Sequence, residues 1–314
     1  MTVYEKVLLV TTNHVGNNLF CTPAIHLLKK HWPDTQFDIV AMSARGAAVF
    51  AQNPDIHKIY ATARKNKIAK LAAKYPLVIG LHHDKAQKYL TGVPTKTLAI
   101  GVSNNHQHRA EETLQFVSHF LGCEAEDSDR RYVLPPQAKH FAAIEKYLKH
   151  STEDILIGLH LGCGRTAVHG WKIWYKNRDQ DERLWPLKKY IQLGKLLVAA
   201  NPRIRMVITG SRNEKFLGKQ FVKQVPGTIN LIGKTSLFTL AALMRYLRLF
   251  ITQDTGALHV ACATEVPLIG LFGPTNPERT GPFPLQQSQH IILKKNSMAE
   301  IMPEEVAEVV LKKL

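Results

Sequence analysis

The chain has 314 residues, 45% of them hydrophobic, which provides enough core for two domains or one large one. Its four cysteines are scattered without a CxxC pair, which argues against a disulfide framework or a zinc site and for a reducing compartment. The formal net charge of +16 predicts attraction to polyanions. No zinc-finger spacing or RNP-type aromatic motif accompanies the charge, so nucleic acid is not expected as a partner.

The N-terminus leads directly into a short apolar strand, and no apolar run approaches the roughly 20 residues that span a bilayer. We therefore expect a soluble, cytoplasmic protein without a signal peptide. The densest basic group is Arg64-Lys65-Asn66-Lys67 with Lys70 and Lys74. This group is either a solvated helix face or a patch that faces a membrane or an acceptor.

The first half alternates strand and helix patterns. Strands are expected over 6–12, 37–42, 56–60, 77–81 and 97–100, and helices over 19–32, 44–52, 65–74, 106–122 and 139–150. Residues 13–18 form an expected loop, which contains His14 and a single glycine. This loop therefore lacks the G-x-G-x-x-G pattern of dinucleotide-binding folds.

Three polar residues, His82, His83 and Asp84, follow the strand expected over 77–81. They could ligate a metal. However, adjacent histidines in a strand point to opposite faces, so we favour side chains that face an acceptor at the end of the strand.

The second half restarts the alternation after a junction expected at about 135–152, which gives domains 1–150 and 151–314. Strands are expected over 155–160, 205–209, 229–231, 247–251 and 266–272, and helices over 187–200, 215–224, 236–247 and 303–314. Between them, residues 165–183 are expected to form a long loop, of a length that is usually functional or mobile. Helices alternating with strands in both halves predict an α/β fold with two parallel sheets, whose strand ends face a cleft.

The second half is organised around the stretch Thr252-Gln253-Asp254-Thr255-Gly256-Ala257-Leu258-His259. It reads as a strand end, a tight turn and the first turn of a helix. Either Asp254 or Thr255 can cap this helix. The free N–H groups of the first turn form an anion site suited to a phosphate. Asp254 also stands at the carboxyl end of its strand, where open α/β sheets bind ligands.

Several motifs together resemble glycosyltransferase family 9, the heptosyltransferases that build the inner core of bacterial lipopolysaccharide. The clearest matches are residues 233–236, 254–259 and 272–282, and weaker ones are 15–17 with 22–23, 75–81, 108–112, 160–164 and 183–186. The resemblance implies a GT-B fold, with two Rossmann-like domains that face a central cleft and no metal. It also implies that the first domain binds the acceptor, that the second binds ADP-heptose, and that helix 303–314 packs back on the first domain.

The resemblance also implies roles for individual residues of the donor site. Asp254 looks like the carboxylate that holds the sugar hydroxyls, and Arg183 stands where the family usually has a lysine. Glu214 would hydrogen-bond the ribose, although an exposed acid at a helix start explains it equally well. The other expected donor-site residues are Thr255, Gly256, Ala257, Leu258 and His259 around the diphosphate, and Gly162 and Gly164 where the backbone approaches the ligand.

One position departs from the family pattern. Asn17 stands where the family has the aspartate that acts as general base, and an amide cannot accept that proton. The base could be another group, with His14, His82, His83 and Asp84 as candidates, or the acceptor's own phosphate could assist. Alternatively, the protein is a catalytically weak or inactive homologue that only binds nucleotide sugars.

We expect an active, inverting and metal-independent glycosyltransferase. It would move a heptose from ADP-heptose, a co-substrate rather than a cofactor, to a phosphorylated lipopolysaccharide core acceptor. The positive charge would draw the enzyme to the anionic cytosolic face of the inner membrane.

Overall fold

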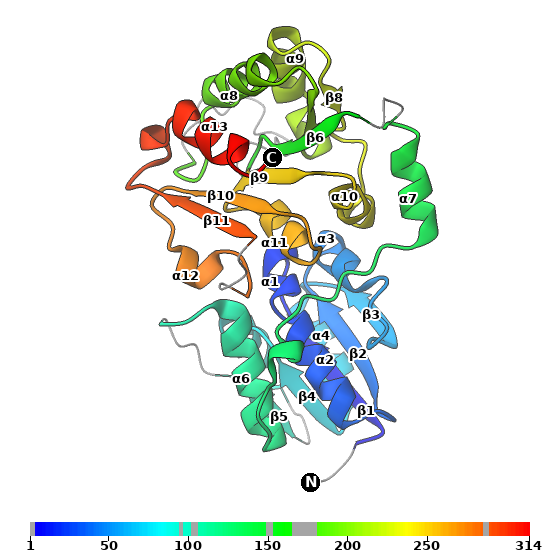
Figure 1. Cartoon of the computed structure of the whole chain (residues 1–314). Helices are drawn as coiled ribbons and strands as arrows, with labels where there is room; N and C mark the ends of the chain where they lie inside the picture. The colour runs from blue at the N-terminus through cyan, green and yellow to red at the C-terminus, as the bar shows by residue number, and fades with distance from the viewer. Residues whose placement is uncertain (1–3, 94–96, 102–105, 149–152, 165–180, 285–288) are drawn as a thin grey trace. The chain divides into compact units, whose positions relative to one another are not determined.

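The computed structural model describes residues 4–93, 97–101, 106–148, 153–164, 181–284 and 289–314 (Figure 1). The chain forms two compact units, Met1–Pro135 and Pro136–Leu314. The division falls before the boundary expected at residue 150, because helix α7 (Ala138–Glu145) packs on α10 (Leu237–Met244) of the second unit. In this contact, the ring of His140 stacks on that of Phe238 with centroids 5.4 Å apart.

The first unit is built on a five-stranded parallel sheet in the order β3-β2-β1-β4-β5. Its strands are β1 (Lys6–Val10), β2 (Gln36–Ala41), β3 (Lys58–Ala61), β4 (Leu77–Gly80) and β5 (Leu98–Ile100). Its helices are α1 (Val15–Leu19), α2 (Thr22–His31), α3 (Ala44–Ala47), α4 (Lys65–Ala72), α5 (His83–Leu90) and α6 (Arg109–Leu121), with 3-10 turns η1 (Ala48–Phe50) and η2 (Asp127–Asp129).

The second unit is built on a six-stranded parallel sheet in the order β11-β10-β9-β6-β7-β8. Its strands are β6 (Ile155–His160), β7 (Ile204–Thr209), β8 (Ile229–Asn230), β9 (Leu249–Gln253), β10 (Leu268–Phe272) and β11 (His290–Lys294). Besides α7 and α10, its helices are α8 (Leu187–Ala200), α9 (Lys215–Gln224), α11 (Gly256–Cys262), α12 (Pro277–Thr280) and α13 (Pro303–Leu311), with 3-10 turns η5 (Arg212–Glu214) and η6 (Met298–Glu300).

Both sheets are doubly wound in the same way. In each unit the chain moves outward from the first strand in one direction and then returns to continue on its other side. The direction therefore reverses between β1 and β4 in the first unit and between β6 and β9 in the second. Open α/β sheets bind ligands beyond the carboxyl ends of the strands at this switch point. The segments that follow these four strands are therefore the expected ligand-binding positions.

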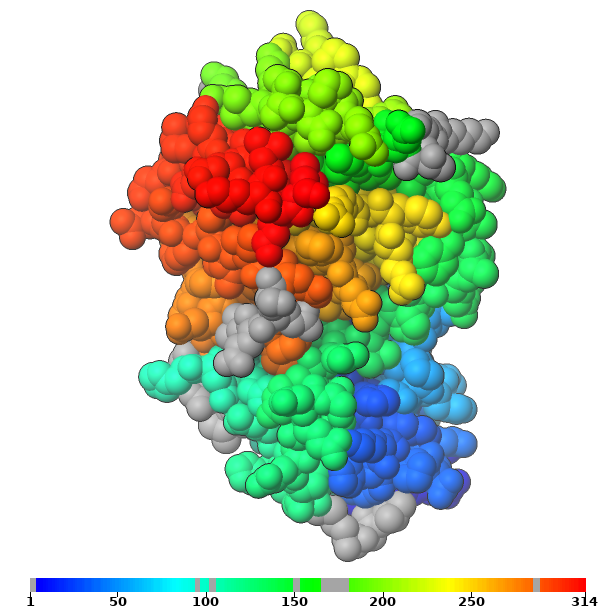
Figure 2. All heavy atoms as spheres, viewed as in Figure 1, coloured from blue at the N-terminus to red at the C-terminus, as the bar shows by residue number. Residues whose placement is uncertain are grey.

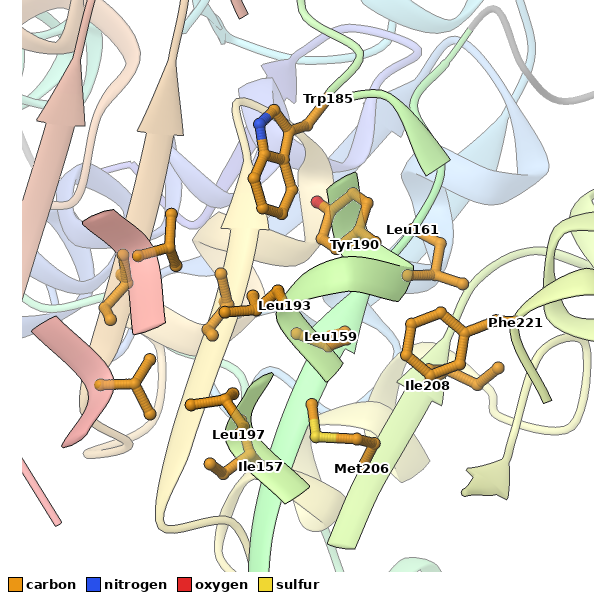
Figure 3. Packing of buried hydrophobic residues seen from close by; sticks show 14 of the residues in the cluster. Ile157, Leu159, Leu161, Trp185, Tyr190, Leu193, Leu197, Met206, Ile208 and Phe221 are labelled. Atoms are coloured by element: carbon orange, nitrogen blue, oxygen red, sulfur yellow. The ribbon is translucent and has the colours of Figure 1, made fainter. Parts of the chain in front are cut away.

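The core of the second unit is formed by side chains from β6, β7, β9 and β10 and from the helices α8, α9 and α13. Figure 3 shows Trp185 and Tyr190 beside the sheet, with Leu193 and Leu197 of α8 over Ile157 and Leu159 of β6. The rings of Trp185 and Tyr190 meet edge to face with centroids 4.6 Å apart. The aromatic residues that follow Arg183 therefore anchor that part of the chain in the core.

The last helix, α13, was expected to pack on the first domain. The contacts described for it run to α8 of its own unit, and Val306, Ala307 and Val310 belong to the second-unit core. Figure 2 shows the atoms of the C-terminal segment lying against those of α8 on the surface of this unit. Within the part of the chain that the structure describes, no helix has the length and apolarity needed to cross a bilayer.

Two local predictions were wrong, and one strand was missed. Residues 15–18, expected as a loop, belong to α1, and residues 83–85, expected as a strand end, begin α5. His82 is consequently the N-cap of a helix and His83 its first residue, so the argument from alternating strand faces does not apply to them. Strand β11 was not predicted at all.

A histidine on β11, whose two ring nitrogens are buried although the side chain is partly exposed, should make the protein less stable in acid. Neither ring nitrogen of His290 has a hydrogen-bond partner among the described residues, and burial lowers the pKa of this side chain from 6.5 to about 4. The unfolded chain therefore takes up the proton first, so stability present above pH 6.5 is lost as the pH falls towards 4, with a loss of about 2 kcal/mol at pH 5. Urea unfolding at pH 7.5 and pH 5 should show a smaller loss for His290→Gln than for the native chain. The exposed His31→Gln is the matched control, and an equal loss in all three proteins would contradict this assignment.

Candidate active site

In the second unit, a cluster of polar side chains surrounds the end of β9. We call Asp181, Arg183, Asp254 and Thr280 the Asp254 cluster. Asp254 directly follows β9 and is only 8% exposed, and Thr280 Oγ1 of α12 donates to its Oδ2 at 3.1 Å. Nε and Nη2 of Arg183 donate to the two carboxylate oxygens of Asp181, both at 3.1 Å. The cluster thus places a fixed guanidinium near a buried carboxylate.

The charges in this cluster are coupled. Burial raises the pKa of Asp254, and the charge of Arg183 and the hydrogen bond from Thr280 act against that rise. Burial would also raise the pKa of Asp181, but its hydrogen bonds with Arg183 outweigh this effect and hold the pKa below its ordinary value. Asp181 is therefore ionised at neutral pH and compensates the charge of Arg183.

Arg183 is positioned by its neighbours along the chain. Its backbone N–H donates to Asp181 Oδ1 at 3.1 Å, and Trp185 Nε1 donates to the carbonyl of Ile301 at 3.0 Å. After β10, a Cβ added to Gly273 would lie 3.2 Å from the carbonyl oxygen of Glu182 and 2.8 Å from the backbone nitrogen of Met298. Only glycine allows this segment to lie so close to the end of the strand.

At the second switch point, the buried side-chain amide of Gln253 links the end of β9 to the segment after β6 by a hydrogen bond. Gln253, the last residue of β9, donates through Nε2 to the carbonyl of Gly162 after β6 at 2.8 Å. The hydroxyl of Tyr190 of α8 lies within hydrogen-bond distance of two acceptors, Gln253 Oε1 and, at 3.0 Å, the carbonyl of His160, and its single proton bonds one of them. A Cβ added to Gly164 would lie 3.9 Å from Arg183 Nη2. Gly162 and Gly164 therefore lie beside the residues of the Asp254 cluster.

The structure shows which residue caps α11 and whether Glu214 is exposed, two points that the sequence left open. Of the two candidates for the cap of α11, Thr255 is the N-cap, and its Oγ1 accepts from the backbone N–H of Ala257 at 3.3 Å. Glu214 is not exposed: it is 3% accessible, and its Oε2 accepts from Ser211 N at 2.6 Å. Behind the start of α11, His259 is also buried, at 3%.

In the first unit, a pocket lies at the other switch point. We call it the Asn17 pocket, and it is lined by Asn17, Phe20, Cys21, Leu81, His82, His83, Asp84, Arg109, Glu112 and Thr113. Asn17 is on α1 after β1, and His82 follows β4. The pocket unites Asn17 with three of the polar residues predicted from sequence, whereas His14, the exposed N-cap of α1, is not among its lining residues.

The backbone around Asn17 is held by its neighbour Asn18. This fully buried side chain accepts from Thr12 N at 3.1 Å and donates to Thr12 O at 3.2 Å, which closes the loop after β1. A Cβ on Gly46 of α3 would lie 2.7 Å from the same amide nitrogen. The segment that carries Asn17 is therefore fixed on two sides.

Sequence reasoning missed several residues of these two sites, including four that are charged or hydrogen-bond to a charged group. Asp181 lies two residues before Arg183, which is a detectable spacing for a local ion pair, and Thr280 lies inside one of the quoted family motifs. Arg109 and Glu112 of the Asn17 pocket were noted only as the polar start of a helix. Across the described ranges, no three His, Cys, Asp or Glu side chains are grouped to hold a metal ion.

Two doubly wound parallel sheets in successive halves of the chain form the GT-B fold, which solved heptosyltransferases share. The chain belongs to glycosyltransferase family 9 (heptosyltransferase), whose sequence model matches residues 68–310. The chain is therefore a glycosyltransferase. The resemblance seen in its motifs is confirmed over most of its length.

Individual relatives are distant. "Lipopolysaccharide heptosyltransferase 3" of Escherichia coli is 22% identical over 291 residues, which cover 83% of this chain and 81% of that protein. The family 9 glycosyltransferase of Veillonella parvula has a similar structure, with a TM-score of 0.79, 20% identity and coverage of 99% of this chain and 97% of that one. For the E. coli heptosyltransferase WaaC with ADP, the TM-score is 0.72 at 17% identity, covering 98% of this chain and all (100%) of that one.

Proposed function

We propose that the protein is an inverting, metal-independent transferase that moves a heptose from ADP-heptose to a phosphorylated inner-core acceptor of lipopolysaccharide. Family membership supports the reaction type, and the names of its relatives support heptose and lipopolysaccharide. The observation that carries the proposal is the Asp254 cluster, which combines a buried carboxylate with a fixed guanidinium at a switch point. A nucleotide sugar needs both groups: the carboxylate accepts hydrogen bonds from a sugar hydroxyl, and the guanidinium binds the diphosphate.

The donor would lie across the ends of β6 and β9. Asp254 accepts from the sugar hydroxyls, and Arg183 with the N–H groups at the start of α11, from Thr255 to His259, binds the diphosphate. Gly162 and Gly164 leave room for the nucleotide. Glu214 accepts from the ribose in addition to its bond from Ser211, since a carboxylate has about four lone-pair sites.

In the reaction, an acceptor hydroxyl attacks the anomeric carbon from the face opposite the diphosphate, which inverts that carbon. The bond from carbon to the phosphate oxygen breaks, and its electron pair leaves with ADP. Negative charge on this oxygen grows in the transition state, where Arg183 and the fixed N–H groups stabilise it without reorganisation.

The acceptor would bind the first unit at the Asn17 pocket. His82 and His83 offer hydrogen bonds to its hydroxyls, and Arg109 offers a cation to its phosphate. The basic residues of α4 are exposed around the buried Ile68, as a surface-binding helix requires. Together with the net charge of +16, they support association with the anionic cytosolic face of a membrane.

Asn17 supports a second candidate, a nucleotide-sugar-binding homologue with weak or no transfer. The deciding experiment incubates the purified protein with ADP-heptose and a truncated lipopolysaccharide, and measures the acceptor mass, with Asn17→Asp alongside. We expect the native chain to add one heptose. ADP-heptose binding with transfer only by Asn17→Asp would establish the binding homologue, and no transfer by either protein would overturn the proposed function.

A further inference from the structure

The Asn17 pocket contains a basic atom within reach of the position where the family has its aspartate. Asn17 Nδ2 and His82 Nε2 are 3.4 Å apart, across the ends of the neighbouring strands β1 and β4. This is longer than a usual hydrogen bond, so an incoming hydroxyl can replace it. The other ring nitrogen, His82 Nδ1, is buried without a hydrogen-bond partner among the described residues. Proton exchange with a ligand therefore runs through Nε2.

Resting on the proposed transfer reaction, we propose that His82 is its general base and that Asn17 positions the imidazole and the acceptor hydroxyl. The base of the family lies at the position of Asn17, in the segment after β1. In this chain the base would be His82, in the segment after β4. Both segments border the same switch point and the same pocket.

The other candidates fit this role less well. His83 is bonded through Nδ1 to the carbonyl of Gly101 at 2.5 Å, after β5, which lies on the side of β4 away from β1. Asp84 is exposed in the first turn of α5. Cys21 lines the pocket, but burial raises the pKa of its thiol to about 12, so the thiol is protonated at neutral pH.

Burial and the neighbouring cations together keep His82 in the basic form. Burial lowers the pKa of its imidazole below 6.5, and the charges of Arg109 and Lys85 lower it further, while Asp84 acts in the opposite direction. Glu112 lines the same pocket. At neutral pH, the ring is therefore uncharged and its Nε2 can accept a proton. Protonation below the pKa of His82 removes that capacity, so transfer decreases towards acid pH.

The step is balanced as follows. The acceptor O–H bond breaks as Nε2 takes the proton, and the oxygen forms its bond to the anomeric carbon. The bond to the diphosphate breaks, and ADP leaves with the electron pair. The imidazolium of His82 then returns its proton to solvent. Asn17 hydrogen-bonds the attacking oxygen but gains no proton.

The test compares kcat and its pH profile in the native chain, His82→Gln, His83→Gln, Asn17→Asp and Asn17→Asp with His82→Gln. His82→Gln should lower kcat by about 10²–10⁴-fold and remove the acid decline that the native enzyme shows. Adding Asn17→Asp to His82→Gln should restore most of the rate, because a carboxylate then stands where the family has its base. The exposed His31→Gln should match the native chain.

Three results would overturn the proposal. The first is an active native enzyme whose His82→Gln variant keeps its rate and acid decline. The second is a decline that disappears in His83→Gln instead, and the third is a double variant that stays as slow as His82→Gln. Urea unfolding followed by circular dichroism verifies that each variant is folded, since all the substitutions lie in the first unit. Transfer by none of the proteins would instead mean that the proposed function is wrong, and the assignment of His82 would fail with it.

Discussion

Asp254→Asn should lower the affinity for ADP-heptose about 10- to 100-fold, because each hydrogen bond to a charged group contributes about 1.5–3 kcal/mol. The variant keeps the size of the side chain and an oxygen that can accept from Thr280, so the protein should fold normally. What it loses is the negative charge, which a sugar hydroxyl needs as a strong acceptor and which acts on Arg183. At ADP-heptose concentrations below saturation, the rate of transfer should fall by a similar factor.

The choice of ligand makes this prediction specific. If Asp254 holds the sugar, calorimetry should show a large loss of affinity for ADP-heptose and little change for ADP. An equal loss for both ligands would place Asp254 at the nucleotide instead. Unchanged binding of both would refute the assignment of the donor site. Asp34→Asn, at an exposed aspartate before β2, is the matched control for the removal of one charge.

Trp185→Ala should have the largest effect on stability, about 3–5 kcal/mol, because it empties a fully buried site against Tyr190. Urea unfolding followed by circular dichroism measures this loss. The folded fraction should also bind ADP-heptose weakly, since Trp185 lies two residues after Arg183 and anchors that segment through the carbonyl of Ile301.

Trp185→Phe separates the ring from its hydrogen bond. The carbonyl of Ile301 also accepts from Lys189 Nζ at 2.9 Å, so removing the indole N–H does not leave it without a donor. The phenylalanine variant should therefore lose only about 1–2 kcal/mol, by reduced packing. If both variants lost the same amount, the hydrogen bond rather than the ring would be the main contribution.

The sequence predicted most strands and the parallel α/β class because buried parallel strands are continuous apolar runs. It could not predict which strands pair. Asn17 and His82 are separated by 65 positions in the sequence. They meet because β1 pairs directly with β4 in the sheet, although β2 and β3 lie between these strands in the sequence. No local pattern contains that pairing.

The errors around His82 and Asn17 also have local causes. Helix α1 has five residues and α5 buries only Ala86 and Leu90, so neither shows a helical apolar stripe of useful length. The alternative that Glu214 is an exposed acid at a helix start was wrong for a different reason: the residue is buried, with Oε2 beside Gly210 just after β7, which a helix-start pattern does not reveal.

The exposure of the four thiols has a practical consequence for labelling. Cys21, Cys163 and Cys262 are buried, and Cys123, just after α6, is the one that is partly exposed. Burial raises the pKa of both Cys21 and Cys262 to about 12, so these thiols resist maleimides, which attack the thiolate. A fluorophore would therefore attach first at Cys123, outside the Asn17 pocket and the Asp254 cluster, without any cysteine having to be removed.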